Sequence, residues 1–528
     1  MCPAAYDSVV DRDVEVPVWG GCMYLTQVLH NAVRHRAAYP LTMFDGRVRS
    51  VAECVDRVGR LAAGLRVLGV GEGDRVALLA ANSDRYHESL LAVAWAGGIV
   101  VPLNTRWVAD EVRFALSDCS ATVVITDERL LPVVAAVRQS APVRTVVVMS
   151  DGRPPAGMVS FEELIGGHAP MPDVGRGGAE TLGVFYTGGT TGRAKGAVLS
   201  HDNVFASAWG CLATGQFTTP GGRLLHAAPM FHLADFAIWI AGLLTGGTHV
   251  MVDGFTPGGV LAAIERYAVT DVLLVPTMIQ VLADCPEAER FDVSSLVRLI
   301  YGGSPMPAAT LAAARRMFPG AGLVQAYGMT ELAPVATLLG PAEHDVPRLA
   351  ASAGRAAPHA EVRVVDAAGD EVAAGVVGEV VVRGDHVMAG YWQRPEETAA
   401  ALRDGWMHTG DAGYFDDDGY LFVVDRIKDM IIVGGENVYS VEVEHVLLQH
   451  PTVAACAVIG LPDARWGERV HALVVPAGDG ADGEQLRAFC RGRLAGYKIP
   501  RTVELVASLP VSPAGKVLKS RLRQERVR

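Results

Sequence analysis

The sequence has 528 residues, of which 50% are hydrophobic, so it is too long for one ordinary domain and apolar enough to bury several cores. Its formal net charge of −12 at pH 7 argues against nucleic acid as a partner. The eight cysteines include no CxxC pair. The sequence therefore predicts neither a zinc ribbon nor a disulfide framework, and a cytoplasmic location fits best.

The longest apolar stretches, around Leu90–Pro102 and Phe236–Leu244, are interrupted by glycines. Both fall short of the roughly 20 residues that a membrane-spanning helix needs. The N-terminus also lacks the basic start and long apolar centre of a signal peptide. We therefore expect no transmembrane segment and no export, while loose contact with a membrane surface stays open.

From about residue 51 to residue 269, helical segments alternate with short β-branched runs. The runs are Val76–Ala80, Ile99–Val101, Thr122–Thr126 and Thr145–Met149, and a helix at Tyr86–Ala96 joins the first two. Further strands are expected at Asp271–Pro276 and Leu296–Tyr301. This alternation predicts strand-helix-strand units and a parallel sheet.

After about residue 360 the pattern changes to shorter alternating strands, at Glu361–Val365 and Gly378–Arg383, which predict a small β-rich subdomain. The last hundred residues begin a new α/β pattern. Its expected elements are the helices Ser440–Gln449 and Gly483–Arg493 and the strands Val453–Ile459 and His471–Pro476. We expect a hinge between the two parts, near Asp425–Met430.

The segment Tyr186–Gly196 reads YTGGTTGRAKG and is the most informative stretch. Its glycines let backbone N–H groups approach an anion, its threonines add hydroxyl donors, and its lysine adds a mobile charge. The residues concerned are Thr187, Gly188, Gly189, Thr190, Thr191, Gly192 and Lys195. A Walker A loop has its lysine directly after the last glycine, so the segment predicts a different kind of polyphosphate site. A plain glycine-rich connector would not need the threonines and the lysine.

This loop resembles the signature of the adenylate-forming superfamily, which includes acyl-CoA synthetases, luciferases and nonribosomal adenylation domains. It differs in Gly188, where serine is common, and in Ala194, where proline is common. The resemblance extends over essentially the whole chain. It implies an α/β protein with a large N-terminal adenylation domain (1–425) of two parallel-rich sheets with helices, including a β-rich subdomain at about 360–425. A hinge (426–430) and a small mobile α+β C-terminal lid domain (431–528) follow.

Three further motifs resemble nucleotide-binding segments of this superfamily. They are YGGSPMP (Tyr301–Pro307), QAYGMTE (Gln325–Glu331) and HTGD (His408–Asp411). The resemblance implies contacts with ATP from Gly302, Gly303, Ser304, Gln325, Ala326, Tyr327, Gly328, Met329, Thr330, Asp411, Phe422 and Arg426. Tyr327 would lie by the adenine, Thr330 would contact the α-phosphate and Asp411 would accept from the ribose hydroxyls. Glu331 and Thr190 would hold Mg²⁺, which neutralises the phosphate oxygens.

The C-terminal part resembles the mobile lid of the superfamily. Lys428 occupies the hinge position, and Gly434, Gly435 and Glu436 resemble the loop that borders the pantetheine tunnel after domain rotation. Lys516, in PVSPAGKVLK, resembles the catalytic lysine of adenylation. Such a lysine is a point charge at the place where two anions meet.

The segment APMFHL (Ala228–Leu233) places His232 where amino-acid-activating relatives carry an aspartate for the substrate amine. An unpaired amine buried in an apolar pocket is costly, which argues against α-amino acids as substrates. The resemblance assigns His232 to the gate of the acyl channel. We expect Asp235 to cap the following helix. The predicted pocket walls are Ile238, Trp239, Gly302, Gly303, Met329, Ala333 and Pro334, which favour a hydrophobic carboxylic acid.

The resemblance therefore implies ATP-dependent activation of a hydrophobic acid to acyl-AMP and transfer to coenzyme A, with release of AMP and pyrophosphate. Two alternatives stay open, an aryl-acid–CoA ligase and a ligase that loads the phosphopantetheine of a carrier protein. The region 361–426 carries no insertion of the kind that marks carrier-specific ligases, which favours CoA. A homodimer also stays open, and no residue argues for luciferase-like oxidation.

Overall fold

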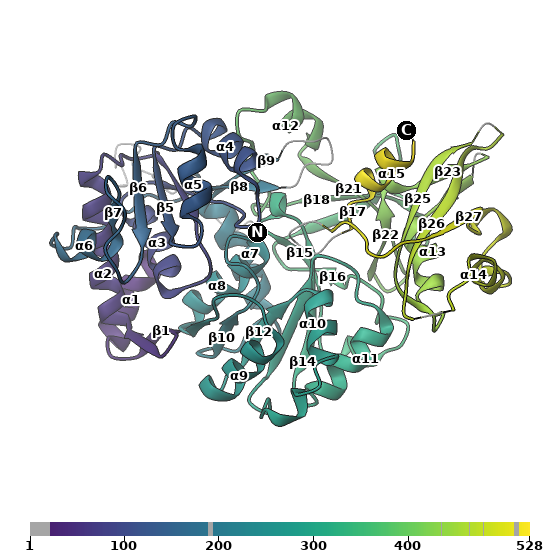
Figure 1. The fold of residues 1–528 in the computed structure, drawn as a ribbon, viewed down its shortest axis with the longest axis horizontal. Coiled ribbons are helices and arrows are strands. Elements are labelled where there is room, and N and C mark those ends of the chain that lie inside the picture. The colour runs from purple at the N-terminus through teal and green to yellow at the C-terminus, as the bar shows by residue number, and fades with distance from the viewer. Residues whose placement is uncertain are drawn as a thin grey trace, which may run out of the picture.

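The computed structural model describes residues 22–187, 194–434, 436–463, 465–478, 480–511 and 517–527. In this part of the chain the strands form four sheets (Figure 1). The two large sheets lie side by side, and the sheet of the C-terminal residues lies at the end of the molecule opposite α2 and α6. This architecture confirms the predicted α/β class with a large N-terminal and a small C-terminal part.

The first large sheet has the strand order β19-β9-β8-β4-β3-β5-β6-β7. The strands from β8 to β7 along this order are parallel, while β9 and β19 are antiparallel additions at one edge. The strands are β3 (Arg75–Leu79), β4 (Ile99–Pro102), β5 (Val123–Asp127), β6 (Thr145–Met149), β7 (Val159–Ser160), β8 (Thr181–Thr187), β9 (Lys195–Ser200) and β19 (Gly390–Tyr391). Its helices are α2 (Val51–Val67), α3 (Asp84–Trp95), α4 (Ala109–Asp118), α5 (Leu131–Val137) and α6 (Phe161–Gly166). The four strands predicted between residues 76 and 149 are confirmed to within two residues.

The second large sheet has the order β16-β15-β14-β13-β12-β10-β11-β1-β2, parallel from β14 to β1. Its strands are β1 (Pro40–Phe44), β2 (Arg47–Ser50), β10 (Arg223–His226), β11 (Thr248–Met251), β12 (Asp271–Leu274), β13 (Arg298–Gly302), β14 (Gly322–Gly328), β15 (Val335–Leu339) and β16 (Arg355–Ala356). The helices of this part are α1 (Gln27–Arg36), α7 (His201–Ala213), α8 (Leu233–Thr245), α9 (Pro257–Tyr267), α10 (Pro276–Ala283) and α11 (Ala308–Met317). Of the helices in the described ranges, none has the length and apolar character to cross a bilayer.

Two smaller sheets complete the chain. The β-rich part holds β17 (Glu361–Val365), β18 (Gly378–Arg383), β20 (Leu402–Arg403), β21 (Trp406–Phe415), β22 (Leu421–Arg426) and the helix α12 (Pro395–Ala401). The C-terminal part holds β23 (Ile431–Val433), β24 (Glu436–Val438), β25 (Val453–Asp463), β26 (Gly467–Pro476), β27 (Thr502–Leu505), α13 (Ser440–Leu447), α14 (Gly483–Cys490) and α15 (Lys519–Arg526). A hinge function for residues 426–430, which include one 3₁₀ turn, stays a prediction.

Serine residues begin several of the helices that cover the large sheets. The side chain of Ser50 accepts from the backbone N–H of Glu53, and the Glu53 carboxylate accepts from the backbone N–H of Ser50. Ser83 and Ser200 cap α3 and α7 through their side-chain oxygens. Each cap satisfies N–H groups that have no partner within the helix, so the starts of α2, α3 and α7 are fixed locally.

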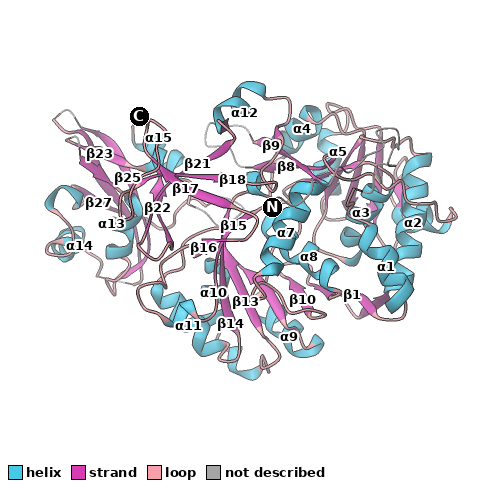
Figure 2. Cartoon of the chain, turned by 180° about the vertical axis from the view of Figure 1, so that it is seen from behind, coloured by secondary structure: helices cyan, strands magenta, loops and turns pink. Residues whose placement is uncertain are grey.

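One continuous hydrophobic cluster joins the two large sheets. It contains side chains of β1, β3 and β11 together with α2, α3, α7 and α8. Figures 1 and 2 both place α7 and α8 between the strands of the two sheets. Every residue of α3 is buried, including its charged ones. The core therefore has to neutralise the charges of α3 internally.

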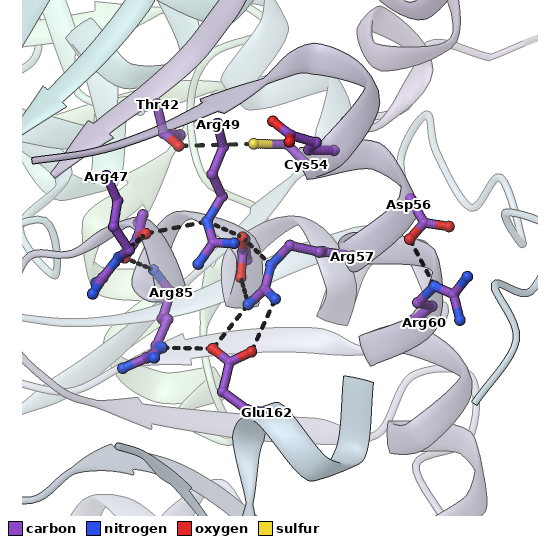
Figure 3. Close-up of polar contacts among 12 residues, drawn as sticks. Thr42, Arg47, Arg49, Cys54, Asp56, Arg57, Arg60, Arg85 and Glu162 are labelled. Carbon is purple, nitrogen blue, oxygen red and sulfur yellow. Dashed lines mark hydrogen bonds and ion pairs between the residues drawn. The ribbon is translucent and has the colours of Figure 1, made fainter. Parts of the chain in front are cut away.

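Arginine–carboxylate pairs supply this neutralisation (Figure 3). The Glu88 carboxylate of α3 accepts from Arg57 of α2 at 2.7 and 2.9 Å and lies 3.2 Å from Arg49 of β2. Arg57 also donates to Glu162 of α6, at 2.9 and 3.0 Å. Bidentate pairs of this kind are strong and directional, so they bind α2, α6 and β2 to α3.

Replacing Glu88 with alanine should lower the free energy of unfolding by about 3 kcal/mol, because it removes a buried carboxylate shared by Arg57 and Arg49, whose remaining partners each pair with another arginine as well. Urea unfolding measures this change. The matched control is Asp110→Ala, which removes the exposed pair of Asp110 with Arg113 and should cost less than about 1 kcal/mol. Equal losses in the two variants would contradict the role of the network.

Candidate active site

The glycine-rich loop is carried by the hairpin of β8 and β9, in which Thr187 lies opposite Lys195. The hairpin therefore brings the two ends of the loop together at one edge of the first sheet. Five of the predicted phosphate-binding residues lie outside the described residues. They are Gly188, Gly189, Thr190, Thr191 and Gly192.

Tyr391 connects Lys195 with Glu331. The Lys195 ammonium group lies 5.0 Å from the centre of the Tyr391 ring, and the Tyr391 hydroxyl donates to the Glu331 carboxylate at 2.7 Å. Burial and the nearby carboxylate raise the pKa of Tyr391 above its usual value, so its hydroxyl keeps the proton that it donates. A lysine and a glutamate predicted from separate motifs thus share one aromatic neighbour, which sequence reasoning missed.

A second cluster holds Asp411 in place. The Tyr327 hydroxyl donates to one carboxylate oxygen of Asp411 at 2.8 Å, and Arg426 lies 2.5 Å from the other. Asp411 and Arg426 are cross-strand neighbours in β21 and β22. Burial, followed by the charge of Asp411, holds the pKa of Tyr327 well above its usual value. The cluster therefore presents a fixed carboxylate next to a guanidinium group, a suitable acceptor for a diol.

The segment 325–331 brings the two clusters together, because Tyr327 and Glu331 are four residues apart on it. It runs from β14 into a 3₁₀ turn at Thr330–Leu332. Lys195, Glu331 and Asp411 come from three motifs that are far apart in the sequence. Glu331 lies on this segment, Lys195 reaches it through Tyr391, and Asp411 bonds to Tyr327. The structure thus gathers a cation and two carboxylates around one segment, as an anion-handling site requires.

On the acid side, His232 occupies the N-cap position of α8 and its ring tilts against Phe231 at 4.8 Å. Ile238 belongs to a buried apolar cluster with residues of β12 to β15, including Ala326 and Val335. Trp239 belongs to the cluster between the two large sheets, and its indole N–H donates to His87. The two predicted pocket walls on α8 therefore lie in different clusters.

The model of a protein family described as "AMP-binding enzyme" matches residues 29–392 of this chain, and that of the "AMP-binding enzyme C-terminal domain" matches residues 442–516. The chain belongs to the family of AMP-binding enzymes. Among curated relatives, a feruloyl-CoA synthase of Amycolatopsis sp is 44% identical over 497 residues, 93% of this chain and 95% of the relative. A long-chain-fatty-acid–CoA ligase of Mycobacterium tuberculosis is 39% identical over 476 residues, 88% and 91% of the two chains.

Solved structures agree with this assignment. The amide bond synthetase McbA from Marinactinospora thermotolerans superposes with a TM-score of 0.85 at 35% identity, over 95% of this chain and all of the other. These similarities place the AMP-binding enzyme described here in the acyl-CoA synthetase branch of the adenylate-forming superfamily.

Two motif glycines of this AMP-binding enzyme have a packing reason for their identity. A Cβ atom at Gly302 would lie 2.3 Å from the Ala326 carbonyl oxygen, and one at Gly328 would lie 1.9 Å from the Pro334 carbonyl oxygen. Both contacts are far shorter than any Cβ atom tolerates, so β13, β14 and the following turn approach too closely for another residue. The remaining members of these motifs are partly exposed or exposed beside them, namely Gly303, Ser304, Gln325, Met329 and Thr330.

Asp118, at the end of α4, bonds to residues that flank the glycine-rich segment 186–196. Its carboxylate accepts from the Tyr186 hydroxyl at 2.8 Å and from Arg394 at 2.7 Å, and its carbonyl oxygen accepts from the Trp392 indole at 3.1 Å. Tyr186 precedes Thr187, and Trp392 follows Tyr391. One aspartate therefore holds both the entry to the loop and the segment with Tyr391, a role without a sequence signal.

The expectation for Asp235 was wrong. The structure starts α8 at Leu233, with His232 at the N-cap, so Asp235 lies inside the first turn. Its carboxylate is fully buried and lies 2.7 Å from Nδ1 of His226. A carboxylate buried this deeply requires a partner, and the histidine at the end of β10 provides one.

The C-terminal residues predicted for the lid are distributed around β22 to β24. Lys428 lies two residues after Arg426 and is exposed, although partial desolvation by its surroundings lowers its pKa. Gly434 has a φ of +61° and packs against the Trp466 ring, while Glu436 is exposed. Phe422 stacks on Tyr414 at 5.1 Å. Gly435 and Lys516 lie outside the described residues.

Acid should destabilise the protein through its buried histidines. Burial lowers the pKa of His87 and His386 to about 3 and that of His201 to about 4. The unfolded chain, with a histidine pKa of about 6.5, therefore binds more protons between pH 4 and 6. Each such histidine should cost up to about 1.4 kcal/mol of stability per pH unit below 6.5.

Urea midpoints between pH 8 and pH 5 test this dependence. The midpoint should be level above pH 7 and fall steeply as the pH drops below 6.5. A midpoint that stays constant down to pH 5 would show that these histidines are protonated or exposed in the native state.

Proposed function

We propose that this AMP-binding enzyme uses ATP to convert a hydrophobic carboxylic acid to an acyl-adenylate and then transfers the acyl group to coenzyme A. The products are acyl-CoA, AMP and pyrophosphate. The observation that carries the proposal is the gathering of Lys195, Glu331 and Asp411 around the segment 325–331. A carboxylate that attacks a phosphate must overcome anion–anion repulsion, and this arrangement counters it with a cation while binding the nucleotide through a diol acceptor.

In the first half-reaction the acid carboxylate attacks the α-phosphate, a P–O bond forms, and the bond to pyrophosphate breaks. Asp411 and Arg426 hold the ribose, and Tyr327 orients Asp411. Lys195 balances charge on the phosphates, and we assign Lys516 the position between the acid and the α-phosphate. Glu331 and Asp411 are buried, and charge interactions are stronger where water is excluded.

Glu331 suits a Mg²⁺ ion, with Thr190 as its partner. Mg²⁺ typically takes one or two carboxylates and fills its other positions with phosphate oxygens and water. In the described ranges no group of three or more histidine, cysteine, aspartate or glutamate residues forms a closed metal site, which fits an ion shared with a substrate. Glu331 is buried and one of its oxygens accepts from Tyr391. The ion would neutralise phosphate charge.

In the second half-reaction a thiol attacks the acyl carbonyl carbon. The C–S bond forms, the bond to the phosphate oxygen breaks, and AMP leaves while the thiol proton passes to solvent. We assign the hinge to Lys428 and the border of the thiol channel to Gly434, Gly435 and Glu436. Rotation of the small domain would move Lys516 away from the reacting atoms and bring the loop of residues 434–436 to them.

The acid that we propose is hydrophobic, and an aryl acid is the leading candidate within that class. Ile238, a predicted wall of the pocket, packs among aliphatic and aromatic side chains such as Phe217 and Leu224, which suits an apolar substrate. The similarity to a feruloyl-CoA synthase, at 44% identity, favours an aromatic acid over a fatty acid. The carrier-protein thiol and, by similarity to McbA, an amine are the alternative acceptors.

An ATP–pyrophosphate exchange assay tests the adenylation step. With ferulate, indoleacetate and palmitate as acids, we expect exchange that depends on acid and Mg²⁺, fastest with an aryl acid. Mass spectrometry with CoA, a phosphopantetheinylated carrier or an amine then identifies the acceptor, with CoA expected. Exchange that is absent with every acid would refute the proposed function.

The two half-reactions should respond differently to Lys516→Ala. Adenylation should fall by about 10²-fold or more, because the charge between the two anions is lost, whereas thioester formation from supplied acyl-adenylate should persist. The control is Arg521→Ala, which removes an exposed cation of α15 five positions further along the sequence. If the Lys516 variant lost both half-reactions equally, the proposal that Lys516 serves adenylation and the loop of residues 434–436 serves thioester formation would be contradicted.

A further inference from the structure

Asn82 lies between β3 and α3, and its buried side chain makes three hydrogen bonds to one distant segment. Its Nδ2 donates to the carbonyl oxygens of His226 at 3.0 Å and of Ala228 at 2.8 Å, and its Oδ1 accepts from the N–H of Met230 at 2.8 Å. Only 6% of Asn82 is exposed. A single amide thus satisfies three backbone groups about 150 residues away in the sequence.

These backbone groups belong to the chain that leaves β10 toward α8. The pairing of β10 with β12 ends at Leu225, and that with β11 ends at His226. Beyond this point, among the residues that the structure describes, no strand pairs with the segment 227–232. Asn82 takes the place of a strand for the Ala228 carbonyl and the Met230 N–H, which are costly to leave unpaired when buried, while the His226 carbonyl also accepts from the Val252 N–H at 3.4 Å.

A second set of contacts closes the same segment on itself. His226, at its start, bonds to Asp235 in the first turn of α8 at 2.7 Å and to His249 of β11 at 2.9 Å. All three side chains are fully buried. The ends of the segment are therefore joined internally, while the Asn82 amide bonds its middle to the loop before α3.

The ATP-side residues depend on other contacts. Lys195 and Glu331 meet at Tyr391, and Asp411 is held by Tyr327 and Arg426. Within the described part of the chain, the side-chain hydrogen bonds of Glu331 and Asp411 run to Tyr391 and Tyr327 and not to Asn82 or the segment 226–235. Disturbing Asn82 should consequently affect one side of the site and spare the other.

We propose that Asn82 is a positioning residue that fixes the segment carrying His232 and thereby controls binding and orientation of the carboxylic acid, with little influence on ATP. The inference rests on the proposed function and on the assignment of His232 to the gate of the acyl channel. Asparagine meets the requirement because it offers two N–H donors and one acceptor in one plane. Aspartate has the same shape but places a charge against two carbonyl oxygens.

The test compares Asn82→Asp with the wild type in ATP–pyrophosphate exchange, using the acid from the panel above that the wild type activates fastest. We expect kcat/KM for the acid to fall by about tenfold or more, as a small misplacement near the reacting groups does, with the KM for ATP changing less than about twofold. The matched control is Thr126→Val, which removes a buried side-chain hydrogen bond to Leu79 at the end of β3. This control should lower stability without altering the ratio of the two KM values.

Equal changes in both KM values, or the same pattern in the Thr126 variant, would reduce Asn82 to a structural residue and overturn the proposal. Asn82→Ser, which keeps one donor and one acceptor, should give an intermediate effect and serves if the aspartate variant fails to fold. If the wild type showed no acid-dependent ATP–pyrophosphate exchange, the proposed function would fail, and this outcome is distinct from the result for Asn82. In that case hydrogen exchange decides the positioning role, since the Met230 amide should lose protection in Asn82→Ala, which removes its acceptor, and an unchanged amide would overturn it.

Discussion

Neutralisation of the charges on the buried helix α3 is the constraint on which the arrangement of the two large sheets depends. Asp84, Arg85 and Glu88 lie inside the protein, and each meets an opposite charge from β2, α2, α6 or the loop after β6. A lone charge at this depth costs several kcal/mol, so these elements cannot separate independently. His87 of α3 accepts a hydrogen bond from Trp239 of α8, so α3 also holds the body of α8. Asn82, just before α3, bonds to the segment that leads into α8.

The nucleotide side follows a different physical rule. Glu331 and Asp411 are each oriented by a tyrosine hydroxyl, from Tyr391 and Tyr327 respectively. A phenol with a raised pKa donates a hydrogen bond without adding charge, so it holds the carboxylate in place and leaves the other oxygen open to further partners. At Asp411 that other oxygen meets Arg426, so the positive charge comes from a separate residue. The two tyrosine hydroxyls thus fix the positions of Glu331 and Asp411 without adding a charge of their own.

The sequence predicted the parts of the molecule that are encoded locally. The parallel strands between residues 76 and 149 follow from alternation of β-branched runs and helices, and the Gln325–Glu331 and His408–Asp411 motifs are contiguous. Tyr391 and Asp118 were missed because their contacts join residues 60 and 276 positions apart, and no local pattern records such a distance. Asp235 was misassigned because a carboxylate before an apolar run is typical of a helix cap, whereas burial against β10 gave it a histidine partner instead.

The short strand β19 covers the edge of the first sheet, so it affects which fragments of the chain stay monomeric. Gly390 and Tyr391 pair with β9, which would otherwise be the exposed edge of the first sheet. A fragment that ended before residue 384 would leave that edge unpaired, and such edges recruit strands from other molecules. Limited proteolysis in the loop before β19 would therefore yield pieces that stay associated, and the N-terminal piece expressed alone would self-associate.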